Sequence, residues 1–129
     1  MTRPLEFPRT LQVRSARDYK RVFAAKRSLR DGLVIAYVAP NGLESSRVGT
    51  AISKRGRNAP IRNRIRRVLR EAWRLERPGL PPGLDWILVV PKHVRDLSLE
   101  PTRASLRRIA GKLAKRLAEE AIEPGEPTA

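Results

Sequence analysis

The sequence predicts a single α+β domain in which helices pack on a small mixed sheet. Its 129 residues correspond to one domain of ordinary size. Segments with helical spacing of apolar residues alternate with short β-branched segments, in the order helix–strand–strand–helix–strand–helix. This order is typical of an α/β sandwich, and we expect the helices on one side of the sheet. The domain is expected over residues 11–122, between a mobile N-terminal segment at 1–10 and a loose C-terminal tail at 123–129.

Capping and β-branched content predict the first three elements. Ser15 and Asp18 have the spacing of a capping box, which predicts a short helix that runs to about Ala25. A strand is predicted over residues 33–39, which read LVIAYVA, because this segment is short, apolar and rich in β-branched residues. A second strand is predicted over residues 47–53 from its alternating pattern.

The second half of the chain predicts a helix, a strand and a final helix. The first helix is expected from about Pro60 to Arg77, because proline suits a first turn, where its missing N–H needs no partner. Prolines and glycines then end the helix. Residues 86–91 form a near-continuous apolar run, as expected for a central strand. Ser98 is a candidate cap for the last helix, which has an apolar stripe from Leu106 to Leu117.

The segment 53–70, SKRGRNAPIRNRIRRVLR, carries the strongest functional signal. On a helix its apolar residues fall on one stripe, and most of its arginines fall on the opposite side and the flanks. Like charges four residues apart cost about 0.2–0.5 kcal/mol per pair, so we expect a polyanion to neutralise this face. A merely solvated helix face is the alternative, but the acid-poor sequence around it argues against that interpretation.

Composition also indicates an anionic partner. The 28 Lys and Arg residues against 13 Asp and Glu give a net charge of +15, which favours nucleic acid or an acidic membrane surface. The membrane is the weaker option, because no apolar run approaches the roughly 20 residues of a span. The charged face is also too wide for an interfacial anchor. No secretory signal is visible, and there is no cysteine for a disulfide or a thiolate metal site. We therefore expect a cytoplasmic protein.

The residue types of catalytic sites do not cluster in this sequence. Its carboxylates are scattered, whereas a metal-dependent nuclease needs several together to hold Mg²⁺. His93 is the only histidine, which excludes a two-histidine acid–base pair, and it is interpreted as a surface loop residue. No phosphate-binding glycine pattern is present. The sequence therefore predicts a binding subunit with no catalytic residue and no metal site of its own.

An ordered set of motifs resembles the bacterial ribonuclease P protein subunit. The central match is Arg62-Asn63-Arg64, followed by Ile65-Arg66-Arg67 and Arg70-Glu71-Ala72, which resembles the family's RNR signature. Further matches are Arg47-Val48-Gly49, Ile52-Ser53-Lys54, Asn58-Ala59, Asp18-Tyr19, Val22-Phe23 and Tyr37. The resemblance extends from about Leu11 to Arg116. The sequence departs from the family pattern at Gly56-Arg57, at Pro60, and at Lys26-Arg27, where the family is expected to have a glycine.

The resemblance implies a fold and a function. The implied fold is a mixed sheet like that of a small-subunit ribosomal protein domain, with a left-handed β–α–β crossover, whereas the general rule favours a right-handed one. The implied function is that of the protein subunit of ribonuclease P. This endoribonuclease removes the 5′ leader of precursor tRNA, and its RNA subunit holds the active site and the Mg²⁺ ions. One protein copy per RNA is expected.

The resemblance also implies residue roles. The candidate RNA-binding residues are Lys54, Arg55, Arg57, Arg62, Asn63, Arg64, Arg66, Arg67 and Arg70. The candidate leader-binding cleft consists of Tyr19, Phe23 and Tyr37, whose rings can stack on unpaired bases. Packing in the protein core is the open alternative for all three. Trp73 and Trp86 are interpreted as structural. A structural RNA-binding protein of another ribonucleoprotein, such as the ribosome, is the alternative function.

Overall fold

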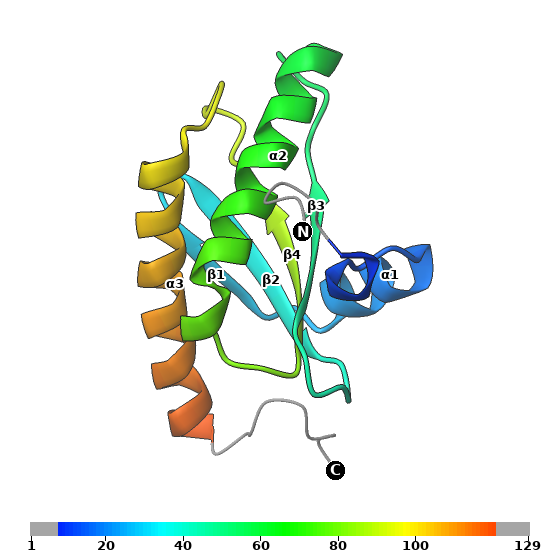
Figure 1. Cartoon of the computed structure of the whole chain (residues 1–129), viewed down its shortest axis with the longest axis vertical. Helices are drawn as coiled ribbons and strands as arrows, with labels where there is room; N and C mark the ends of the chain where they lie inside the picture. Colours follow the sequence, from blue (N-terminus) through cyan, green and yellow to red (C-terminus); the bar gives the residue numbers. More distant parts are fainter. Residues whose placement is uncertain (1–7, 121–129) are drawn as a thin grey trace, which may run out of the picture.

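Four strands form one mixed sheet in the order β1-β2-β4-β3 (Figure 1). The computed structural model describes residues 8–120, so most of the predicted mobile segment 1–10 and the whole predicted tail 123–129 lie outside the described residues. β2 pairs antiparallel with both β1 and β4, and β4 pairs parallel with β3. The strands are β1 (Ser28–Asp31), β2 (Val34–Pro40), β3 (Arg47–Ala51) and β4 (Leu84–Val89).

Helices cover both faces of this sheet. α2 and α3 pack together over one face, and α1 contacts β2 and β4 on the other. The helices are α1 (Ala16–Ala24), α2 (Ala59–Glu76) and α3 (Leu99–Glu120), with short 3-10 turns η1 (Arg9–Leu11) and η2 (Arg77–Gly79). The expectation that all helices lie on one side is therefore wrong for α1. The sheet is apolar on both faces, so each face needs its own cover.

The central strand β4 connects two hydrophobic clusters. Trp86 and Leu88 point into the large cluster below α2 and α3, where Trp73 is also fully buried. Ile87 points the opposite way, into a small cluster with Val22 of α1. This alternation follows from the two-residue period of a strand. It confirms the prediction of a central apolar strand and the structural interpretation of both tryptophans.

The β3–α2–β4 connection is left-handed. β3 and β4 are parallel neighbours, and Figure 1 shows both strands running upward with α2 in front of the sheet and β4 to the left of β3. A right-handed connection would place β4 on the other side. The implied left-handed crossover is confirmed. Because of this topology, α2 follows the edge strand β3 and begins at one end of the domain, as Figure 1 shows.

The short strand β1 was not predicted from the sequence. It reads SLRD, and only Leu29 is buried in the large cluster. With polar residues at the other positions, it lacks the apolar pattern by which a strand is recognised. It exists because backbone groups of Ser28 to Asp31 pair with those of Val34 to Tyr37 at the sheet edge.

Candidate nucleic-acid interface

The helix α2 separates an apolar face from a cationic one, as its sequence predicts. Ile65, Leu69 and Ala72 are fully buried against the sheet and α3, while Ile61 and Val68 pack at the margin of that core. The helix begins with Asn58, whose side-chain oxygen accepts a hydrogen bond from the N–H of Ile61 at 3.0 Å. Pro60 occupies the first turn, as expected. Burial of the apolar stripe therefore fixes the rotation of α2 and turns its arginines outward.

Most of the candidate RNA-binding residues lie on this outward surface. Lys54 and Arg55 are exposed in the loop before α2, and Asn63, Arg64 and Arg67 are exposed on the helix. Three more arginines of the set are half-buried at the helix flanks, namely Arg62, Arg66 and Arg70. We call the group formed by Arg62, Asn63, Arg64, Arg66, Arg67 and Arg70 the α2 arginine surface.

Few acids neutralise the α2 arginine surface. Arg64 forms an ion pair with Asp96 at 2.7 Å, in which both side chains are largely exposed. Arg66 donates to the side-chain oxygen of Asn63 at 2.8 Å, which leaves its charge uncompensated. Within residues 8–120, Arg67 and Arg70 have no ion-pair or hydrogen-bond partner for their guanidinium groups. This surface therefore keeps most of its positive charge available to a ligand.

Two acids elsewhere in the described residues are paired with arginines of α3. Glu76 binds Arg103 and Arg107 of α3 at 2.7 and 2.8 Å. Asp31 binds Arg108 at 2.7 Å and accepts a hydrogen bond from Ser105. The hydrogen bond from Arg108 is the main cause that lowers the pKa of the Asp31 carboxyl. Arg103, Arg107 and Arg108 thus connect α3 to the end of α2 and to β1.

Arg57 does not belong to the exposed set, which corrects the expectation from the sequence. Its side chain is 5% exposed. The guanidinium donates to three backbone carbonyls, those of Ser53 at 3.2 Å, Pro91 at 2.9 Å and Val94 at 2.7 Å. These bonds join the loop before α2 to the loop after β4. Arg57 fixes the base of the α2 arginine surface from inside the protein.

The three candidate cleft residues come together on the other face of the sheet. Tyr19 and Phe23 belong to α1, and Tyr37 belongs to β2. The rings of Phe23 and Tyr37 meet edge to face, with centroids 4.8 Å apart and planes at 65°. Phe23 is 37% exposed although it is a large apolar residue. The cluster therefore packs on the sheet with one edge open to solvent, and its binding to the leader stays a prediction.

Tyr19 is held by its hydroxyl group. The Tyr19 oxygen accepts a hydrogen bond from the N–H of Thr50 at 3.0 Å and donates to the Thr50 carbonyl at 3.2 Å. Both polar functions of the hydroxyl are used within the protein. The ring therefore has one fixed position between α1 and β3.

A buried carboxylate anchors α1 to the sheet and was missed in the sequence. Asp85 is fully buried on β4, and Arg47 of β3 binds it with two hydrogen bonds, at 2.8 and 2.6 Å. Arg21 of α1 forms an ion pair with the same carboxylate, and Asn41 donates to it at 3.0 Å. The sequence placed Asp85 among scattered acids. Only the strand register, in which Arg47 is its partner, reveals the pair.

The described residues form neither a metal-binding cluster nor a membrane-spanning helix. Between residues 8 and 120, no group of three or more His, Asp or Glu side chains could hold a metal ion. His93 is exposed in the loop after β4, which agrees with its interpretation as a surface residue. No helix within the described part of the chain is long and apolar enough to cross a membrane.

The fold and the surface define a class: a basic α+β domain whose left-handed crossover helix presents unpaired arginines. Comparison with known proteins gives the family. The ribonuclease P family profile matches residues 7–114. The chain therefore belongs to the ribonuclease P protein family, the protein components that assemble with ribonuclease P RNA to form an endoribonuclease of tRNA processing.

Individual relatives agree with this assignment. The ribonuclease P protein component of Pelotomaculum thermopropionicum is 34% identical over 93 residues, which are 72% of this chain and 83% of that protein. That of Shouchella clausii is 34% identical over 108 residues, covering 83% of this chain and 88% of the relative. The solved RNase P protein of Thermotoga maritima superposes with a TM-score of 0.71 at 23% identity, covering 78% of this chain and 96% of that one. This last similarity shows the shared fold.

Proposed function

We propose that the α2 arginine surface binds the ribonuclease P RNA and that the aromatic cluster of Tyr19, Phe23 and Tyr37 binds the 5′ leader of precursor tRNA. One observation carries the proposal: Arg67 and Arg70 have no partner within residues 8–120, while nearby acids are paired elsewhere. Guanidinium groups match phosphates in geometry and charge, and phosphate contacts dominate the affinity of proteins for nucleic acids.

The aromatic cluster supports the leader-binding part of the proposal. A leader is single-stranded, and aromatic faces bind unpaired bases of any sequence for about 1–3 kcal/mol per base. The hydroxyl of Tyr19 is fixed by Thr50, so its ring is already in place before a ligand arrives. Phe23 supplies the exposed apolar edge of the cluster. A preformed aromatic surface loses little entropy on binding.

In this proposal the protein binds and the RNA cleaves. The RNA subunit hydrolyses one phosphodiester bond to give the mature tRNA 5′ end, and it holds the Mg²⁺ ions of the reaction. The arginines contribute fixed positive charge close to both RNAs. This charge reduces phosphate repulsion, which Mg²⁺ would otherwise have to screen, so less Mg²⁺ is required. We propose one protein per RNA subunit, acting in the cytoplasm.

The test is cleavage of precursor tRNA by a bacterial ribonuclease P RNA at low Mg²⁺, with and without the full-length protein. The wild-type protein should restore cleavage at the mature 5′ end. The double variant R67Q/R70Q should need a higher protein concentration, because two phosphate contacts are lost. Lys115→Gln removes a charge from an exposed position of α3 and should behave like the wild type. Cleavage by the protein without RNA, or no rescue by wild-type protein that still binds RNA, would contradict the proposal.

A second comparison separates the two binding surfaces. Phe23→Ala should weaken binding of a precursor tRNA with a long leader by about thirtyfold, which corresponds to about 2 kcal/mol, the middle of the stacking range. It should leave assembly with the ribonuclease P RNA unchanged. With a substrate whose leader is too short to reach the cluster, this variant and the wild type should bind alike. An equal loss for both substrates would assign Phe23 to folding alone.

A further inference from the structure

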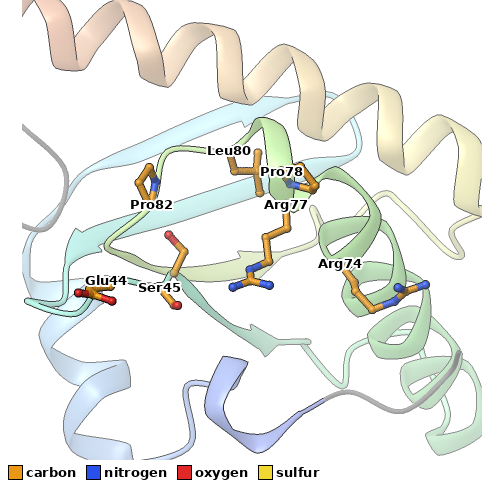
Figure 2. Close-up of a pocket in the computed structure, with 8 residues that line it drawn as sticks. Glu44, Ser45, Arg74, Arg77, Pro78, Leu80 and Pro82 are labelled. Atoms are coloured by element: carbon orange, nitrogen blue, oxygen red, sulfur yellow. The ribbon is translucent and has the colours of Figure 1, made fainter. Parts of the chain in front are cut away.

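An open pocket lies at the C-terminal end of α2, beyond the residues of the family signature. Its volume is about 450 Å³. One wall comes from the end of α2 and from η2, and the other from the segment between β2 and β3 (Figure 2). The lining residues are Glu44, Ser45, Ser46, Arg74, Arg77, Pro78, Leu80 and Pro82.

The pocket walls are fixed by the protein itself. Ser46 is buried, and its hydroxyl donates to the Pro81 carbonyl at 2.9 Å and accepts from the N–H of Leu84 at 3.0 Å. The side chain of Asn41 donates to the Ser45 carbonyl at 3.0 Å, which holds the opposite wall. Prolines restrict the loop between α2 and β4. The cavity is therefore present before any ligand binds.

Arg77 provides a free cation inside this pocket. Figure 2 shows its side chain extending from the end of α2 toward the segment that carries Ser45. The side chain is half-buried, and within residues 8–120 its guanidinium has no hydrogen-bond or ion-pair partner. The neighbouring Arg74 is bound to Glu71 at 2.5 Å. Cations favour the C-terminus of a helix, which accounts for the presence of both arginines there. It does not account for the orientation of Arg77, which faces the cavity and forms no ion pair within residues 8–120.

Arg77 also continues the α2 arginine surface. Arg77 has helical dihedral angles, so the spacing of α2 extends to it. At about 100° per residue, Arg66, Arg70, Arg74 and Arg77 fall within an arc of about 80°. The rise of 1.5 Å per residue spreads them over about 16 Å. One RNA strand following this line of guanidinium groups would reach the pocket.

We propose that the pocket binds a backbone phosphate of the ribonuclease P RNA, with Arg77 as the donor. The proposal rests on the proposed function of the α2 arginine surface and lengthens that surface to the end of the helix. Glu44, on the opposite wall, is exposed and has no hydrogen-bond or ion-pair partner in the described part of the chain. Its carboxylate repels a phosphate, so the phosphate lies against the arginine wall. Glu44 is therefore expected to weaken binding.

The experiment measures binding of the full-length protein to a bacterial ribonuclease P RNA transcript over a range of salt concentrations. Arg77→Gln should lower the slope of log K against log salt by about 0.7–0.9, the effect of one lost phosphate contact. Glu44→Gln should bind more tightly than the wild type. Lys115→Gln is the matched control, because it removes the same charge from an exposed site on α3. Thermal unfolding of each variant checks that the fold is intact.

The outcomes distinguish this inference from the proposed function. If R67Q/R70Q weakens binding while Arg77→Gln matches Lys115→Gln, the pocket inference fails and the proposed function stands. The proposed function fails if the wild-type protein does not bind the RNA tightly, and also if the R67Q/R70Q variant binds it as tightly as the wild type does. If Glu44→Gln weakens binding, the pocket binds a hydrogen-bond donor such as a base edge, and the phosphate assignment is overturned.

Discussion

Gly49 lies against the hydroxyl end of the Tyr19 side chain. A Cβ atom at position 49 would come within 2.4 Å of the Tyr19 hydroxyl oxygen and 2.8 Å of the ring carbon that carries it. The same hydroxyl is bonded to the backbone of the next residue, Thr50. The absence of a side chain at Gly49 thus allows α1 to dock on the sheet and sets the position of the proposed leader-binding cluster.

Gly49→Ala should destabilise the protein and disturb the cluster. The added methyl group forces the Tyr19 ring away from Thr50, and overpacking of this kind costs about 1–3 kcal/mol. Chemical denaturation should show this loss, and affinity for leader-bearing precursor tRNA should fall with it. Gly111→Ala is the control, since nothing lies within 4 Å of a Cβ there. In the middle of α3 it should stabilise by about 0.5–1 kcal/mol. Equal stability of the two variants would contradict the close-packing argument.

Lys26→Gly should stabilise the protein. Lys26 follows α1 and has a φ of 55°, a left-handed conformation that costs a side-chain-bearing residue energy. Glycine adopts this conformation without strain. Part of this benefit is offset because glycine also gives the unfolded chain more conformational entropy, so the expected net increase in the free energy of unfolding is about 0.5–1 kcal/mol. The free energy of unfolding from urea titration measures it. Lys26→Ala removes the charge but keeps the strain, and a gain of equal size in that variant would show that charge is the cause.

Asp31 should contribute to loss of stability in acid. The hydrogen bond from Arg108 holds the pKa of its carboxyl below the ordinary value of 3.8, and Ser105 adds to this effect. A carboxyl with a lowered folded-state pKa stabilises the fold above its unfolded pKa, and this stabilisation disappears as the pH falls through the folded value. Asp31→Asn should therefore be less stable than the wild type near neutral pH. The two unfolding curves should converge below the folded-state pKa; a constant difference would exclude titration of Asp31 as the cause.

Periodicity predicted most of the fold because the buried residues of most helices and strands follow the regular spacing of their own segment. The apolar stripe of α2 and the run that forms β4 can be recognised from the sequence, and Ser15 caps α1 as its spacing indicates. Family resemblance, rather than any local pattern, predicted the left-handed crossover. The strand β1 could not be predicted, because its stability comes from backbone pairing with β2 and not from its own residues.

The candidate interface was predicted less completely, for a related reason. The helical spacing separates arginines from the apolar stripe, but it cannot tell which of them meet a carbonyl or a carboxylate. Arg57 is adjacent in sequence to residues with exposed charge, yet its acceptors include Pro91 and Val94, more than thirty positions away. Asp85 finds Arg47 across strands in the same way. Buried charges are identified by tertiary contacts, which a local pattern does not contain.

Arg57 and Arg67 should therefore separate stability from RNA binding. Arg57→Ala leaves three carbonyls, one of them buried and two partly buried, without this donor and should cost about 2–4 kcal/mol of unfolding free energy. Arg67→Ala removes an exposed side chain that has no partner within residues 8–120, so thermal unfolding should be unchanged.

For RNA affinity, we expect the opposite ranking of the two variants, provided that both are measured at a temperature at which they are fully folded. Arg67→Ala should then lose affinity and reduce the salt dependence, because one phosphate contact is gone, while Arg57→Ala should bind nearly as well as the wild type. If folded Arg57→Ala instead loses more affinity than Arg67→Ala, the buried guanidinium contributes to binding beyond holding its two loops together.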